Sequence, residues 1–124
     1  MKATVLLFNF QDKERVMKIR RALLPLKFCI RQVPKSEYLQ PAGFLAGDKS
    51  VNPVKEVYDG PELSDEMLLM AGMGSQEIDA LIMALRRQGV GKINYKAVLT
   101  ETNRHWRIID LFEEIKKEHE AMTK

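Results

Sequence analysis

Residues 4–10 read TVLLFNF, and residues 67–73 read MLLMAGM. Each stretch is a short and almost continuous apolar run. Such runs are typical of strands that are buried on both faces of a sheet. The two runs therefore predict the two central strands of one sheet.

A helical pattern follows each of these strands. After the first strand, Asp12 is a suitable N-cap and apolar residues recur at helical spacing until Pro25. After the second, Ser75 is a plausible N-cap and Gly89 ends the pattern. The apolar stripes consist of Val16, Ile19 and Leu23 in the first helix and of Ile78, Leu81, Ile82 and Leu85 in the second.

A second, less apolar strand completes each unit, at residues 27–33 (KFCIRQV) and 93–99 (INYKAVL). The two units predict an α+β fold, a βαββαβ sandwich of ferredoxin-like topology with the first and third strands at the centre. An open parallel α/β sheet is the alternative, because right-handed crossovers serve both. The units superpose without a gap, which places Leu6 on Leu68, Val16 on Ile78 and Leu23 on Leu85.

A long insertion separates strands 2 and 3. This central excursion, residues 34–64, carries four of the five prolines and is too long for a plain loop in a compact domain. We expect a short helix around residues 36–40, with the apolar side chains of the excursion packed onto the domain. An extra C-terminal helix is predicted to begin near Asn103, with an inner stripe of Ile108, Leu111, Phe112 and Ile115.

Length and composition fit a single soluble globular domain over residues 1–124, with 45% hydrophobic and 30% charged residues. Cys29 is the only cysteine, so an intrachain disulfide is excluded, and its place in a strand suggests a small core residue. The apolar run at the N-terminus is too short for a signal peptide or a membrane span, which predicts a cytoplasmic protein.

The net charge of +3 is unevenly distributed. Residues 1–33 contain eight basic and two acidic residues, whereas residues 34–66 contain three basic and seven acidic ones. Opposite charges on adjacent segments could steer an anionic partner or support self-association. The alternative is that these charges simply lie on solvated faces.

Five stretches of the chain resemble, in their order and spacing, a family of short bacterial proteins catalogued only as a domain of unknown function. They are VLLFNF, RALLPLKF, YLQPAGFLAG, DEMLLMAGM and KAVLTETNRHW. The resemblance covers nearly the whole chain and implies a stand-alone bacterial cytosolic protein. It implies no activity and assigns no catalytic or binding residue.

The first candidate binding site is the turn at Gly72, Gly74 and Ser75, between a strand and a helix. Backbone N–H groups at a helix N-terminus can hold a phosphate or a carboxylate. A dinucleotide-binding motif would require a glycine where Glu77 stands, and a P-loop lysine is missing. An ordinary capped turn is the alternative.

The second candidate comprises Thr100, Asn103, Arg104, His105 and Trp106, which follow the end of a strand. Ligand sites in α/β proteins are often found after strand ends, and this polar cluster beside an indole could hold a small polar ligand. The alternative is a capped helix N-terminus with the indole sealing the core.

Other chemistries find less support in the sequence. The third strand lacks the aromatic residues on which RNA bases would stack, so nucleic acid is not an expected partner. Cys29, His105 and His119 have no companion at catalytic or metal-ligand spacing, so neither a catalytic residue, a metal nor a cofactor is predicted. The methionines around the second helix suit a core, or alternatively an adaptable groove.

These observations favour a non-enzymatic interaction or regulatory module. Self-association through a sheet edge or the central excursion is the expected mode, and a partner protein is the other option. The alternative function is a small-ligand-binding sensor of ferredoxin-like topology, an analogy that rests on the fold alone. No membrane partner is expected.

Overall fold

The computed structural model describes residues 1–123. Four strands within these residues form one mixed sheet. The two apolar runs occupy its centre, as predicted. The strands are β1 (Thr4–Phe8), β2 (Cys29–Val33), β3 (Met67–Ala71) and β4 (Tyr95–Val98).

The order of the strands is β2-β1-β3-β4, with parallel pairs at both edges and an antiparallel pair, β1 and β3, at the centre. In a ferredoxin-like sheet, a strand of the other unit separates the two strands of each βαβ unit. The predicted ferredoxin-like topology is therefore wrong, and so is an open, wholly parallel sheet. The apolar content of the strands shows which two are central. It does not distinguish the observed strand order from the ferredoxin-like one, because β1 and β3 are central in both.

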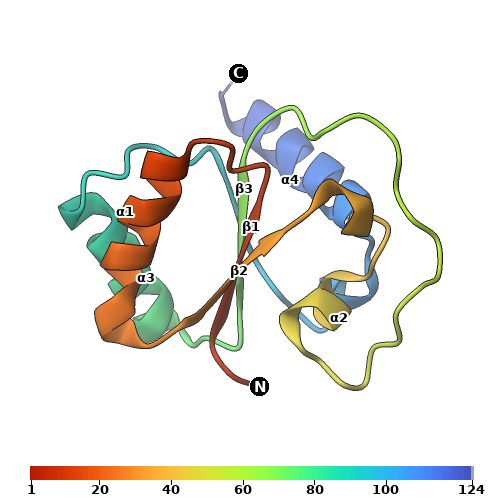
Figure 1. The fold of residues 1–124 in the computed structure, drawn as a ribbon, viewed down its shortest axis with the longest axis horizontal. Coiled ribbons are helices and arrows are strands. Elements are labelled where there is room, and N and C mark those ends of the chain that lie inside the picture. Colours follow the sequence, from red (N-terminus) through yellow and green to blue (C-terminus); the bar gives the residue numbers. More distant parts are fainter. Residues whose placement is uncertain (124) are drawn as a thin grey trace.

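Helices cover both faces of the sheet (Figure 1). On one face, α1 (Lys13–Leu23) lies against α3 (Ser75–Arg87), and their apolar stripes pack on the side chains of Val5, Leu7, Leu68 and Met70. On the other face, α2 (Ala42–Ala46) and α4 (Ile108–Thr123) pack on Leu6, Phe8, Met67 and Leu69. The central strands are thus buried on both faces, which explains their unbroken apolar sequences.

The start of α1 agrees with the prediction, whereas the starts of α3 and α4 differ from it. Asp12 accepts hydrogen bonds from the backbone N–H groups of Glu14 and Arg15, so the predicted cap of α1 is confirmed. The cap of α3 is Gly74 and not Ser75, which is the first helical residue. The C-terminal helix begins at Ile108 and not near Asn103, because residues 103–105 form a separate 3₁₀ turn.

The two βαβ units differ by one residue. The central strands β1 and β3 span Thr4–Phe8 and Met67–Ala71, an offset of 63 positions, whereas Ile19 and Leu81 occupy matching buried places at an offset of 62. The strand-to-helix turn has four residues in the first unit and three in the second. The gapless superposition is therefore right for the helices and wrong by one residue for the strands.

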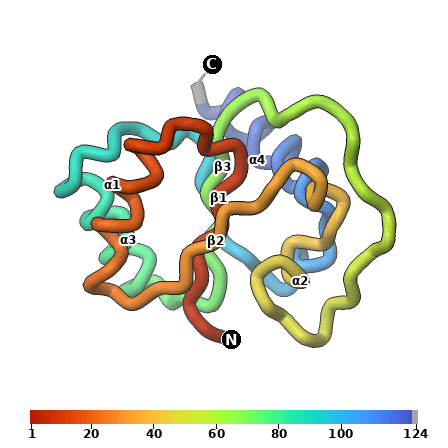
Figure 2. Tube along the Cα trace, viewed as in Figure 1, coloured from red at the N-terminus to blue at the C-terminus, as the bar shows by residue number. Residues whose placement is uncertain are grey.

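The excursion packs onto the α2–α4 side of the sheet (Figure 2). Its helices are a 3₁₀ turn at Lys35–Glu37 and α2, rather than one helix around residues 36–40. The backbone of α2 is tied to the turn before α4, since the N–H of Ala42 donates to the carbonyl of Trp106. Of the helices within residues 1–123, none combines the length and apolarity that a membrane span requires.

The edge position of β2 exposes most of its side chains. Cys29, expected in the core, is exposed, and only Val33 of this strand is fully buried. An edge strand that pairs on one side only has less apolar surface around it than the central strands. The packing interpretation of Cys29 is therefore wrong.

Candidate functional site

The predicted cluster at residues 100–106 is a self-contained turn. Asn103 is buried, its Oδ1 accepts from the N–H of Thr100 at 2.8 Å, and its Nδ2 donates to the carbonyl of Val98 at 3.0 Å. The Thr100 hydroxyl accepts from the N–H of Asn103 at 3.1 Å. These bonds close the chain after β4 and occupy the polar groups of Asn103.

Arg104 joins this turn to the excursion. Its Nη1 lies 2.9 Å from Asp48 Oδ2 and 2.9 Å from the Ser50 hydroxyl, and its Nε lies 3.5 Å from Glu101 Oε2. Hydrogen bonds from Ser50, together with Arg104, lower the pKa of Asp48 to about 2. The guanidinium therefore serves as an internal tie between residues 48–50 and the turn.

The other two members of this cluster face solvent. His105 is exposed, and Trp106 retains 36% of its accessible surface. The indole therefore does not seal the core. Ligand binding by residues 100–106 stays a prediction.

The predicted turn at residues 72–75 is tight and exposed. Gly72 has φ +70°, and a Cβ there would lie 2.8 Å from the Lys2 carbonyl oxygen. The N–H of Gly74 donates to Glu77 Oε1 at 3.0 Å, which places a carboxylate at the start of α3. Ser75 is exposed, and anion binding at this turn also stays a prediction.

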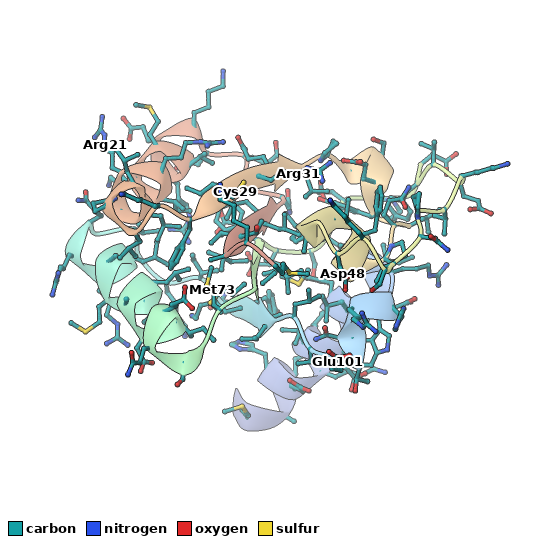
Figure 3. All side chains as sticks on the ribbon, turned by 90° about the horizontal axis from the view of Figure 1, so that it is seen from below. Arg21, Cys29, Arg31, Asp48, Met73 and Glu101 are labelled. Carbon is teal, nitrogen blue, oxygen red and sulfur yellow. The ribbon has the colours of Figure 1, made fainter. Side chains whose placement is uncertain are left out.

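The two predicted turns lie at the same end of the sheet without merging. They follow parallel strands whose last paired residues are Met70 and Val98. In Figure 3, which views the molecule from below, Met73 of one turn and Glu101 of the other lie apart from each other. Each turn is therefore best treated as an independent candidate.

A cavity separate from both turns lies between the C-terminal half of α3 and the start of β4. It has a volume of about 630 Å³, within the range of small-molecule sites. Its eight lining residues include three cations and no acid. They are Ile82, Leu85, Arg86, Gly89, Gly91, Lys92, Ile93 and Lys96, and we call this cavity the α3–β4 pocket.

The loop that forms one wall of this pocket is fixed from the side of α1. Arg15 Nη1 donates to the carbonyl of Val90, and Arg15 Nη2 donates to the carbonyl of Lys92 at 2.7 Å. Gly89 and Gly91 have φ of +66° and +84°, which a residue with a side chain rarely adopts. The loop therefore holds a defined shape without help from a ligand.

The charges of the pocket lie close enough to affect one another. Burial, followed by the nearby charges of Lys92 and Arg86, lowers the pKa of Lys96. The Lys96 ammonium donates to the carbonyl of Ile93 at 2.8 Å. Three cations around an apolar floor of Ile82, Leu85 and Ile93 make this cavity suited to an anion.

The sequence alone does not reveal this pocket, because each of its cations resembles an ordinary surface residue. A signal was nevertheless present, since residues 80–100 contain four basic residues and no acidic one.

Within residues 1–123 no group of three His, Cys, Asp or Glu side chains is arranged to hold a metal ion.

Comparison with known proteins is informative for the second half of the chain. Residues 66–122 match the model of a domain of unknown function, DUF3783, so the expected resemblance to an uncharacterised family is confirmed for this segment. No curated protein and no solved structure matches the chain. The matched segment contains β3, α3 and β4, and therefore every residue that lines the α3–β4 pocket. These comparisons assign no function to the chain.

Proposed function

We propose that this protein is a regulatory domain that binds a small organic anion in the α3–β4 pocket. The observation that carries the proposal is the lining of the pocket, with Arg86, Lys92 and Lys96 and no carboxylate. A ligand with one carboxylate or phosphate and an apolar body matches both the cations and the apolar floor.

The electrostatics of the α3–β4 pocket support the same proposal. In the free protein the three cations repel one another, and this repulsion contributes to the lowered pKa of Lys96. An anion between them replaces repulsion by attraction and raises the pKa of Lys96 again. The fixed loop around Gly91 adds to affinity, because little chain entropy is lost on binding.

Titration followed by NMR tests this function, with benzoate, inorganic phosphate and adenosine monophosphate as probes. We expect the two organic anions to bind more tightly than phosphate. We also expect Lys92→Gln/Lys96→Gln to weaken their binding about tenfold or more. The matched control, Lys2→Gln/Lys117→Gln, removes two exposed charges outside the pocket.

Two results would contradict the proposal. One is the absence of saturable binding by all three probes, and the other is equal binding by the wild type and Lys92→Gln/Lys96→Gln. A response that survives in that variant but is lost in Arg104→Ala would move the site to the turn at residues 100–106.

A second candidate function is an interaction module that associates with itself. It is supported by the separation of charge in the fold, since the basic helix α1 and the acidic excursion lie on opposite faces of the sheet (Figure 1). Sedimentation at several concentrations and ionic strengths tests it, and an association that weakens at high salt is the expected outcome. We also propose that the protein acts in the bacterial cytoplasm, and cell fractionation of the source organism tests this location.

A further inference from the structure

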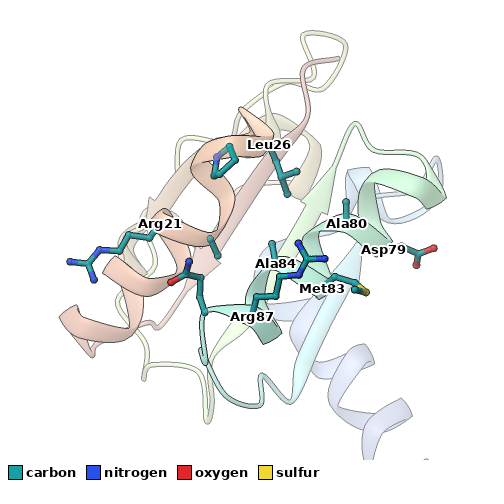
Figure 4. A pocket seen from close by; sticks show the side chains of 10 residues that line it. Arg21, Leu26, Asp79, Ala80, Met83, Ala84 and Arg87 are labelled. Carbon is teal, nitrogen blue, oxygen red and sulfur yellow. The ribbon is translucent and has the colours of Figure 1, made fainter.

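The outer surface of the α1–α3 layer carries a groove that the proposed anion site does not use. It has a volume of about 420 Å³ and runs between the two helices (Figure 4). Its apolar lining includes Ala22, Ala80 and Met83, while Arg21 and Arg87 supply two positive charges and Asp79 supplies one negative charge. We call it the α1–α3 groove.

The surroundings of this groove are apolar, and their net charge is positive. Met83, in its lining, retains 50% of its accessible surface, and Met17, one helical turn before Arg21, retains 51%. Residues 13–28 contain six basic residues and one acidic residue. Methionine adapts to different partners, and the arginines select a partner that carries negative charge.

A protruding segment with the complementary character lies at the far side of the molecule. Val57, in the excursion, retains 69% of its accessible surface and stands between the exposed carboxylates of Glu56 and Asp59, which outnumber the one exposed cation nearby, Lys55. We call residues 54–61 the Val57 segment. In Figure 2 this part of the chain lies on the opposite side of the sheet from α1 and α3.

The Val57 segment is held in place on both sides of Val57. The side chain of Gln40 donates to the carbonyl of Val54 at 2.8 Å and accepts from its N–H at 2.9 Å. The N–H of Tyr58 donates to the carbonyl of Ser36 at 3.0 Å. The centroid of the Tyr58 ring lies 5.8 Å from that of the Tyr38 ring. The segment therefore presents Val57 without an ordering cost on binding.

We propose that the α1–α3 groove receives the Val57 segment of a second copy of this chain, with Glu56 and Asp59 beside Arg21 and Arg87. The inference rests on the second candidate function and names its two surfaces. Because groove and segment lie on opposite sides of one molecule, a chain cannot fill its own groove. The contact is head-to-tail, and each added copy offers a free groove at one end and a free segment at the other.

Sedimentation velocity over a concentration series tests this contact through a charge swap. The wild type is expected to increase in average mass with concentration. Arg21→Glu/Arg87→Glu and Glu56→Lys/Asp59→Lys should each remain monomeric, because like charges then meet in the contact. The chain that carries all four changes should associate again, since its charges are complementary once more.

Lys2→Glu/Lys117→Glu is the matched control, because it reverses two exposed charges outside both surfaces and should associate like the wild type. A wild type that stays monomeric at every concentration would overturn both this contact and the second candidate function. Association that persists in either double variant would overturn the contact alone, as would failure of the fourfold variant to recover. Titration of the α3–β4 pocket is independent of all these outcomes, because none of the exchanged residues lines it.

Discussion

Arg15 of α1 and Glu66, just before β3, form an ion pair that joins the two βαβ units, with Arg15 Nε 3.0 Å and 3.1 Å from the two carboxylate oxygens. The same guanidinium holds the carbonyls of Val90 and Lys92 in the loop of the α3–β4 pocket. One side chain of the first unit therefore sets the shape of a cavity in the second.

We predict that Arg15→Met lowers the free energy of unfolding by about 2 kcal/mol, because Glu66 and two carbonyl groups lose their donor. Urea denaturation measures this loss. Arg21→Met, on the exposed side of the same helix, should change stability by less than about 0.5 kcal/mol. Arg15→Met/Glu66→Gln should recover part of the loss, and a double variant as unstable as the single one would contradict the pairing.

The same variant should depend on pH in a defined direction. Burial already raises the pKa of Glu66 in the wild type, although Arg15 opposes this effect. In Arg15→Met the pKa rises further, since only the charged carboxylate is penalised. The stability lost by the variant should therefore be largest above that pKa and should shrink as pH falls through it. A loss that is independent of pH would show that the carboxylate does not contribute.

Lys96 provides a second pH-dependent prediction. Burial and the neighbouring cations lower its pKa in the folded state below the ordinary value of 10.5. The folded protein thus releases this proton at a lower pH than the unfolded chain, so the penalty on the charged form is present at pH 7 and disappears above about 10.5. Relative to Lys96→Met, the wild type should become more stable as pH rises through this window. Parallel stability curves for the two proteins would refute the prediction.

Asp48 should behave in the opposite way. Its pKa of about 2, held down by hydrogen bonds from Ser50 and by Arg104, lies below the ordinary value of 3.8. The carboxylate therefore contributes stability above pH 3.8, and this contribution is lost as pH falls through about 2. An NMR titration should find the pKa of Asp48 raised towards 3.8 in both Ser50→Ala and Arg104→Ala. An unshifted value in either variant would remove that residue from the explanation.

Gly72 and Gly74 make a matched pair for backbone strain. A Cβ at Gly72 would meet the Lys2 carbonyl at 2.8 Å and would also require φ of +70° from a residue with a side chain. We expect Gly72→Ala to cost about 2 kcal/mol or more. A Cβ at Gly74 meets only Glu77 Oε1, at 3.9 Å, so Gly74→Ala should cost less than about 1 kcal/mol. Equal losses in thermal denaturation would contradict this account.

The periodicity of apolar residues predicted the helices and the sheet centre because burial leaves a direct mark on sequence. The stripe through Ile19 and Leu23 is buried, as expected. Strand order leaves no such mark, since the apolar content of β1 and β3 is the same whichever edge strand lies beside them. Cys29 was misplaced for a different reason, because a strand at the edge of a sheet exposes side chains that a central strand buries.

The candidate site was harder to predict than the core. Capping and ion pairing engage the side chain of Asn103 and Nη1 of Arg104, and residues of both kinds look alike in sequence whether they bind ligands or neighbours. The cations of the α3–β4 pocket lie within eleven consecutive residues, but they belong to a helix, a loop and a strand, and only the folded chain brings Arg86, Lys92 and Lys96 around one cavity. Charge spacing alone does not contain that information.

The pairing of Leu6 with Leu69 at the middle of the sheet has a consequence for how the two halves depend on each other. Two βαβ units that meet through antiparallel strands have the geometry of subunits in a symmetric dimer, here joined into one chain by the connection between β2 and β3. The seam between these internal protomers runs through the two leucines. Shortening both to alanine would open one shared void, so the two losses of stability should not add.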